Sequence, residues 1–256
     1  MNKKFLNLAL FSAFILFMVS LPMIFVDRYL PQSQHPWQLQ PFGNDSLSSF
    51  YKDNYLVVGD TALMEFLQDS SRTTVNILVD GWGVPYDEEL LVQDFEPFKE
   101  NSAKYAIHNR MFGFTAIVES GEFGRGFTEG LFLFNGDSST CKKKQQNIKR
   151  YFSDFRCFEG FEDGQIVSVL DSLLADGSWK RVGWTTYGTR EGNREKIHLL
   201  LDNLSQLAKR YPQVQFIVQG THRPIFGAPE VKRKYLAPWV PAVFLNSSFV
   251  RSTGNL

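Results

Sequence analysis

Short apolar runs alternate with amphipathic segments along most of this chain, and this alternation constrains the fold more than any other feature. Runs that are typical of buried strands occur at residues 55–58, 75–79, 103–107, 180–186, 214–218 and 240–245. Segments with the spacing of a helix lie between them, at residues 61–68, 88–99, 166–174 and 194–210. Strands that alternate with helices predict an α/β domain, with a mainly parallel central sheet and helices on both of its faces.

The N-terminus predicts a membrane segment. Lys3 and Lys4 precede residues 5–26, which are almost entirely apolar and carry no charged side chain. As a helix, a run of this length spans a hydrocarbon core of about 30 Å. The two lysines predict a single-pass anchor whose N-terminus stays in the cytoplasm. A cleaved signal peptide is the alternative, because a basic start fits it as well. Both interpretations place the rest of the chain outside the cytoplasm.

We therefore divide the chain into three parts. Residues 1–28 are the cytoplasmic lead and the membrane anchor or signal peptide, and residues 29–50 are a polar linker with helix breakers. Residues 51–256 are an extracytoplasmic α/β domain that is long enough for a sizeable core. The 27 Lys and Arg residues balance the 27 Asp and Glu residues, so the net charge does not predict a nucleic-acid partner. The sequence does not indicate an oligomeric state.

The two cysteines agree with this location. Cys141 and Cys157 bracket a lysine-rich segment and an aromatic one. In an oxidising compartment, a close pair of this kind predicts a disulfide. Two free thiols in a core are the alternative, and a metal site is disfavoured because neither cysteine has a His or Cys at ligand spacing. The basic run at 142–144 is more typical of a solvated loop than of a contact with an anionic polymer.

Polar residues at three strand ends form a candidate metal site. Asp80 follows the strand at 75–79, and His222 lies beyond the strand at 214–218. Thr115 comes after a glycine, beyond a third strand. In an open parallel sheet, ligands bind outside the carboxyl ends of the strands. A hydroxyl that contacts a metal there has a lowered pKa and becomes a nucleophile.

Each of these residues also has an ordinary structural explanation. An Asp-Gly pair after a strand is often a simple turn. A threonine in a glycine-flanked loop, such as Thr115, is more often structural than catalytic, and His222 could satisfy backbone groups. The prediction of a site rests on the three residues in combination.

These motifs resemble the sulfatase-like branch of the alkaline phosphatase superfamily, which includes lipoteichoic acid synthases and phosphoethanolamine transferases. Residues 76–81 resemble the first strand of that branch, which ends in an acidic metal ligand. Residues 113–119 resemble the nucleophile motif, and residues 220–222 resemble the late metal motif. The resemblance implies an alkaline-phosphatase-like sandwich over residues 74–246.

The resemblance also implies roles for individual residues. Asp80, Thr115 and His222 would bind one divalent cation (Mn, Mg, Zn or Ca), and Thr115 would attack phosphorus or sulfur. Arg110, or alternatively Arg125, would hold the anionic group through bidentate hydrogen bonds. The implied function is a membrane-anchored, metal-dependent phosphoester or sulfoester hydrolase or transferase. The anchor favours an anionic envelope lipid or glycan as the substrate.

Thr221 departs from the family pattern, in which an aspartate precedes the histidine. A neutral hydroxyl at this position removes one negative charge from the ligands of the cation, so we expect weak binding. Asp87, Glu88 or Glu89 could supply a substitute, although acidic residues at the start of a helix more often serve as caps. The alternative function is therefore a catalytically degenerate sulfatase-like module that binds a glycan or a partner protein.

Overall fold

A computed structural model describes residues 46–58, 71–109, 130–148, 152–189, 192–224, 229–237 and 239–246. These residues belong to one compact unit, Gly43–Leu256. Several predicted features lie outside the described residues: the apolar run at 5–26, the helix at 61–68, Arg110, Thr115 and Arg125. Within the described part of the chain, no helix combines the length and the apolar character needed to cross a membrane.

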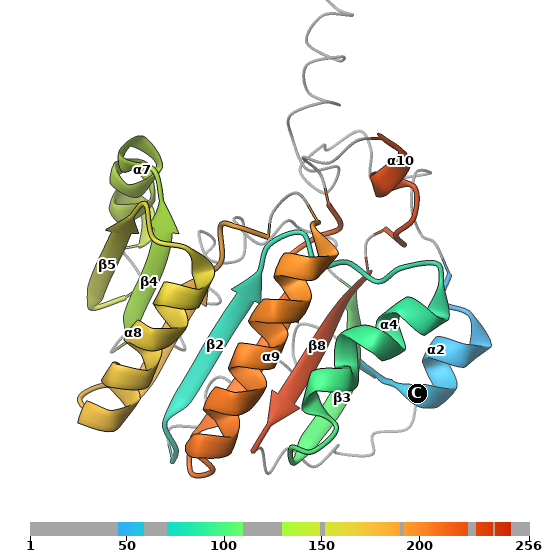
Figure 1. Cartoon of the computed structure of the whole chain (residues 1–256), viewed down its shortest axis with the longest axis horizontal. Helices are drawn as coiled ribbons and strands as arrows, with labels where there is room; N and C mark the ends of the chain where they lie inside the picture. The colour runs from blue at the N-terminus through green and yellow to red at the C-terminus, as the bar shows by residue number, and fades with distance from the viewer. Residues whose placement is uncertain are drawn as a thin grey trace, which may run out of the picture. The chain divides into compact units, whose positions relative to one another are not determined.

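The described strands form one eight-stranded sheet with the order β1-β3-β8-β7-β2-β6-β4-β5 (Figure 1). They are β1 (Leu56–Val58), β2 (Thr74–Val79), β3 (Ala103–Asn109), β4 (Leu131–Gly136), β5 (Asp154–Glu159), β6 (Arg181–Thr185), β7 (Gln215–Gly220) and β8 (Trp239–Leu245). Only the pairings of β8, with β3 and with β7, are antiparallel among these strands. The predicted mainly parallel sheet is confirmed, and the carboxyl ends of β2, β6 and β7 lie at one edge.

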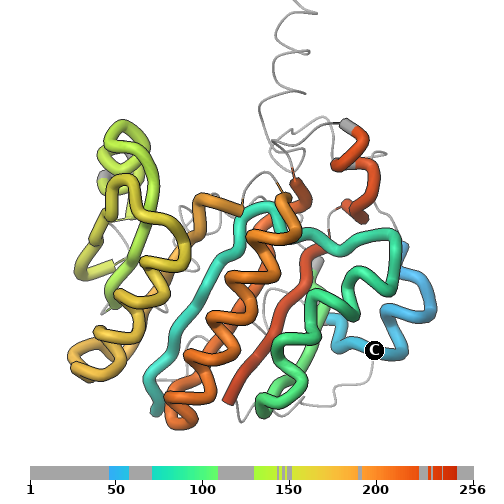
Figure 2. Tube along the Cα trace, viewed as in Figure 1, coloured from blue at the N-terminus to red at the C-terminus, as the bar shows by residue number. Residues whose placement is uncertain are grey.

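Helices cover both faces of the sheet, as predicted. The helices α4 (Glu88–Phe95), α8 (Asp163–Asp176) and α9 (Arg194–Arg210) lie in front of the sheet in Figure 2. Their buried apolar side chains belong to one core cluster with those of β2, β6 and β7. On the opposite face, Cys141 and Ile148 of α7 (Ser138–Ile148) join a second cluster with Phe132 and Phe134 of β4. The two clusters follow from the alternation of side chains along each strand. Three short helices complete the described part: α2 (Ser49–Asn54), η2 (Glu96–Phe98) and α10 (Pro229–Lys232).

The structure differs from the predicted elements at several places. The predicted helix at 88–99 becomes α4 followed by the 3-10 helix η2, because Pro97 has no N–H with which to continue an α-helix. The basic run at 142–144 lies in α7, so its assignment to a loop was wrong. Within the predicted linker, Leu47 is buried in the core and α2 begins at Ser49, so the fold begins earlier than we predicted.

The disulfide between Cys141 and Cys157 is confirmed, with a Cα–Cα distance of 6.0 Å. It ties α7 to β5, the last strand of the sheet order. Because the bridge spans a sequence separation of 16, we expect the double variant Cys141→Ser/Cys157→Ser to lose about 3 kcal/mol of unfolding free energy. Urea unfolding of the full chain in detergent tests this. Reduced wild-type protein should match the variant, whereas an unchanged midpoint in both would contradict the prediction.

Candidate functional site

The structure brings Asp80 and His222 into contact. Asp80 follows β2 and His222 follows β7, and these parallel neighbours pair Val79 with Gly220 at their last positions. The residues that come next therefore emerge side by side. Asp80 Oδ1 lies 2.6 Å from His222 Nε2. The same oxygen accepts a hydrogen bond of 2.8 Å from the hydroxyl of Thr221.

The contacts of the two ring nitrogens of His222 favour one protonation state of the ring. Its Nδ1 lies 2.6 Å from the carbonyl oxygen of Arg223, which can only accept, so Nδ1 carries a proton. Its Nε2 faces the carboxylate of Asp80. With an acceptor beside each ring nitrogen, the doubly protonated form of the ring is the one that can donate at both positions. Both side chains are only 18% exposed, so solvent screens this pair weakly.

Burial and charge shift the pKa values of Asp80 and His222 in opposite directions. Burial alone would raise the pKa of the Asp80 carboxyl, but the charge and hydrogen bond of His222 and the hydrogen bond from Thr221 lower it overall. The charge of Lys144 on α7 adds to the lowering. Burial alone would lower the pKa of His222, but the charge and hydrogen bond of Asp80 and the hydrogen bond to Arg223 raise it. The two charged forms therefore stabilise each other.

The loop after β6 fixes the backbone at Asp80. The backbone N–H of Asp80 donates to Thr186 Oγ1 at 2.9 Å, and the hydroxyls of Thr186 and Thr189 are 2.6 Å apart. Both threonines are buried. Neither threonine stands out in the sequence, because a threonine in a loop carries no distinct signal. The position of Thr186 at the end of a predicted strand was the only available indication.

Asp163, in the first turn of α8, holds the same loop from the other side. Its carboxylate accepts from the backbone N–H groups of Tyr187 at 3.2 Å and Gly188 at 3.1 Å, and from Asn135 Nδ2 at 2.7 Å. Burial raises the pKa of Asp163, although these hydrogen bonds oppose the rise. Trp184 Nε1 donates to Asn135 Oδ1 at 3.1 Å and extends the network into the core. The loop is thus held from β4, β6 and α8.

Glycines allow the loops around Asp80 and His222 to approach closely. A Cβ on Gly220 would lie 1.9 Å from the carbonyl oxygen of Trp82. Gly192 has a φ of +72°, and a Cβ there would lie 2.2 Å from Pro224 Cγ. Side chains at either position would push apart the loops that follow β2, β6 and β7. The close contact of Asp80 and His222 depends on these approaches.

The other candidate residues have different positions. Thr115 and Arg110 lie outside the described residues, so their roles stay predictions. Asp87 caps α4 by accepting from the backbone N–H of Glu89 at 3.1 Å, which confirms the expected capping role. His198 lies 3.4 Å from Asp94 Oδ1, in a cluster separate from the Asp80–His222 pair.

The described donors suit a divalent cation in type but are few in number. Asp80 offers a carboxylate and His222 an imidazole, which are ordinary ligands of such ions, while Thr221 adds a neutral hydroxyl. Among the described residues, no three His, Cys, Asp or Glu side chains are grouped to hold a metal. Catalytic zinc sites commonly have three protein ligands. Thr115 is the third ligand that the resemblance implies.

No protein-family model and no curated protein matches this chain. Among solved structures, it is similar to a protein in the alkaline phosphatase superfamily from Vibrio parahaemolyticus, at 14% identity and a TM-score of 0.46, with 75% of this chain and 70% of that chain covered. It is also similar to phosphoglycerate mutase from Leishmania mexicana, crystallised at low cobalt concentration, at 10% identity and a TM-score of 0.30. That match covers 49% of this chain and 31% of the other. Both likenesses are remote, so the functional argument rests on the site.

Proposed function

We propose that this chain is a metal-dependent phosphoester or sulfoester hydrolase or transferase of the sulfatase-like, alkaline phosphatase type. One observation carries the proposal: Asp80 Oδ1 and His222 Nε2 lie 2.6 Å apart. The motif resemblance selects both residues independently, from segments that are distant in the sequence. They meet at the edge of the sheet where ligands bind in parallel α/β folds.

The described residues have distinct parts in this chemistry. Asp80 would bind the cation through its charge, and His222 would contribute a ring nitrogen after releasing a proton, which makes metal affinity dependent on pH. Thr221 and His222 both contact Oδ1 of Asp80, so Oδ2 is the oxygen available to the cation. The cation, when bound, would polarise the ester and lower the pKa of the Thr115 hydroxyl. Arg110 would hold the anionic group of the substrate.

The location that we propose follows from the N-terminal sequence. Residues 5–26 would anchor the chain in the membrane with its N-terminus in the cytoplasm, and residues 51–256 would be extracytoplasmic. The confirmed disulfide agrees with an oxidising compartment. An anionic envelope lipid or glycan, which stays close to the membrane, is then the substrate class that such an enzyme would meet.

Removal of the proposed nucleophile tests this function. In the full chain in detergent, we expect Thr115→Ala to reduce turnover of p-nitrophenyl phosphate or p-nitrophenyl sulfate by on the order of 10³-fold or more. Assays should contain Mn²⁺, Mg²⁺, Zn²⁺ or Ca²⁺ in turn. Ser172→Ala is the matched control, because it removes an exposed hydroxyl on α8 that donates to the carbonyl oxygen of Ser168. Equal turnover by Thr115→Ala and wild type would contradict the proposal.

A catalytically degenerate module that binds a glycan or a partner protein is the second candidate. The hydrogen bond from Thr221 to Asp80 favours it, because a neutral hydroxyl stands where the family pattern has a carboxylate. Such a module would bind an anionic glycan without binding a divalent cation. Metal content and turnover therefore discriminate between the two functions.

A further inference from the structure

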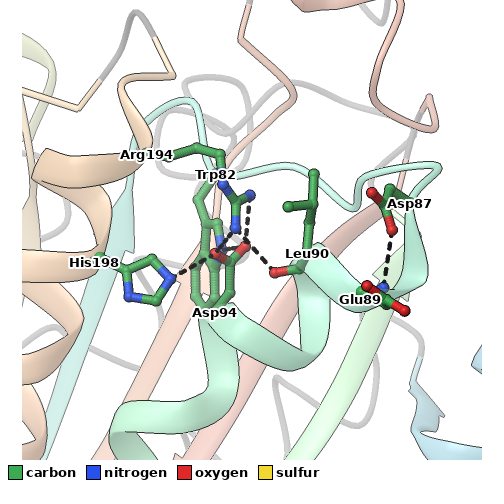
Figure 3. A network of polar contacts seen from close by, with 7 residues as sticks. All are labelled: Trp82, Asp87, Glu89, Leu90, Asp94, Arg194 and His198. Atoms are coloured by element: carbon green, nitrogen blue, oxygen red, sulfur yellow. Dashed lines mark hydrogen bonds and ion pairs between the residues drawn. The ribbon is translucent and has the colours of Figure 1, made fainter.

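A buried carboxylate lies behind the candidate site. Asp94 on α4 is only 1% exposed, accepts hydrogen bonds from two side chains and lies close to a third (Figure 3). Trp82 Nε1 donates to its Oδ2 at 3.0 Å, and Arg194 Nη2 donates to its Oδ1 at 2.7 Å. His198 Nε2 lies 3.4 Å from Oδ1. We call these four residues, Asp94, Trp82, Arg194 and His198, the Asp94 cluster.

The Asp94 cluster joins three segments of the fold. Trp82 lies in the loop that carries Asp80, and Arg194 is the first residue of α9, directly after the loop that follows β6. Arg194 Nη2 also donates to the carbonyl oxygen of Leu90 on α4, at 3.0 Å. Hydrogen bonds between charged groups are roughly twice as strong as neutral ones. The carboxylate of Asp94 thereby holds the Trp82 side chain in place against α4 and α9.

A shift of Trp82 would move the loops that carry Asp80 and His222. Its indole ring is 1% exposed and packs edge-on against Phe95 with ring centroids 6.1 Å apart, so the ring has no room to move alone. Its carbonyl oxygen lies 1.9 Å from the position of a Cβ on Gly220, just before Thr221 and His222. A Cβ on Gly83 would likewise lie 2.8 Å from the Cα of Arg223. The backbone of the Trp82 loop therefore packs closely against the loop that carries His222.

We propose that Asp94 is a positioning residue of the candidate site: through Trp82 it fixes the loop of Asp80 against the loop of His222. Asp94 does not contact Asp80 or His222; it affects the distance and orientation between their side chains. Its effect on catalysis rests on the proposed function, whereas its effect on the geometry of the pair does not. The two effects can therefore be measured separately.

Two variants isolate this role. Trp82→Phe keeps an aromatic ring and removes the indole N–H that reaches Asp94. Tyr211→Phe is the matched control, because it also keeps an aromatic ring and removes a donor to a carboxylate, Asp171 Oδ1, at 2.8 Å. Tyr211 directly follows α9, at the end of the helix away from Arg194. Each variant loses one hydrogen bond to a carboxylate, so a purely structural effect should be similar in the two.

The first measurement is the exchange rate of the His222 ring N–H protons, by ¹⁵N NMR of the full chain in detergent. We expect exchange to be about tenfold faster or more in Trp82→Phe, because the loss of a hydrogen bond to a charged group loosens the loop. Tyr211→Phe should exchange at nearly the wild-type rate. Equal rates in the two variants, or a wild-type ring without slowly exchanging protons, would overturn the proposal.

A second variant applies if Trp82→Phe does not fold. Arg194→Lys retains the positive charge beside Asp94 and removes the planar fork that also reaches Leu90. We expect it to raise the His222 exchange rate clearly above the wild-type rate. A wild-type rate in Arg194→Lys would overturn the proposal.

Turnover separates this inference from the proposed function. If the wild type hydrolyses p-nitrophenyl phosphate, kcat of Trp82→Phe should fall by about 10- to 100-fold, with KM within about threefold of wild type. An equal fall in kcat for Tyr211→Phe would contradict the inference. If the wild type shows no turnover, the proposed function fails, and the exchange rates still decide whether Asp94 positions the pair.

Discussion

Replacing Thr221 with aspartate should raise the affinity for Mn²⁺ by about 10- to 100-fold, because it adds a second carboxylate beside Asp80. The hydroxyl of Thr221 lies 2.8 Å from Asp80 Oδ1, and the side chain is 1% exposed. Without a cation, two carboxylates at this separation repel each other. The metal-free variant should therefore melt at a lower temperature than wild type. Addition of Mn²⁺ should raise its melting temperature by more than that of wild type.

Titration calorimetry with Mn²⁺, and thermal unfolding with and without a chelator, measure these effects. Thr221→Asn is the matched control, because it has nearly the shape of aspartate but no charge, and it should not increase the affinity. If Thr221→Asp and Thr221→Asn bind Mn²⁺ equally, the position beside Asp80 is not part of a cation site. A gain in Thr221→Asp alone would also explain how the natural threonine weakens the site.

Gly220→Ala should lower the free energy of unfolding by about 3 kcal/mol, since it overpacks a tight backbone contact. The added Cβ would lie 1.9 Å from the carbonyl oxygen of Trp82 and 3.0 Å from its carbonyl carbon. The strand cannot simply move away, because Gly220 pairs with Val79 in the ladder between β7 and β2. The substitution should also separate Asp80 from His222.

Gly164→Ala provides the control for that substitution. Gly164 lies in α8, and a Cβ there would meet no atom within 4 Å. Alanine favours a helix by up to about 1 kcal/mol over glycine, so this variant should be as stable as wild type or more stable. Urea unfolding compares the free energies of unfolding of the two variants, provided that both have the m value of the wild type. Similar losses in the two variants would contradict the steric explanation.

The elements that were predicted correctly have strong apolar patterns. In α9, Ile197, Leu200, Leu201, Leu204 and Leu207 recur at helical spacing, and all five are buried as the spacing predicts. The strand β2 is a continuous buried run and was predicted for the same reason. Tertiary packing was not needed to find either element.

Two of the missed elements, α7 and β5, lack such patterns, whereas β4 was missed although it is an apolar and continuously buried run. Cys141 and Ile148 are the side chains of α7 that join the core, and between them the helix is lysine- and glutamine-rich, so no apolar period is visible. The strand β5 lies at the end of the sheet order, and Phe155, which is 8% exposed, is the one residue of the strand that is buried. A strand with so little burial shows no clear alternation. Only the pairing of β5 with β4 reveals it.

The candidate site was predictable in part. Asp80 and His222 stand out as polar residues at the ends of apolar runs, but their contact depends on β2 and β7 being neighbours, which the sequence does not specify. The contributions of Thr186 and Asp94 were not predictable. Asp94 resembles any acidic residue on a helix until α9 places Arg194 against it. Residues that act through tertiary contacts leave no local pattern.

The stoichiometry of Mn²⁺ bound to the full chain tests whether Asp80 and His222 hold a divalent cation. We expect one saturable site per chain in the wild type, lost in Asp80→Ala and in His222→Ala. Asp87→Ala removes a carboxylate that caps α4 and should keep the site. A wild-type chain that binds no Mn²⁺, or an Asp80→Ala variant that binds it as wild type does, would contradict the claim.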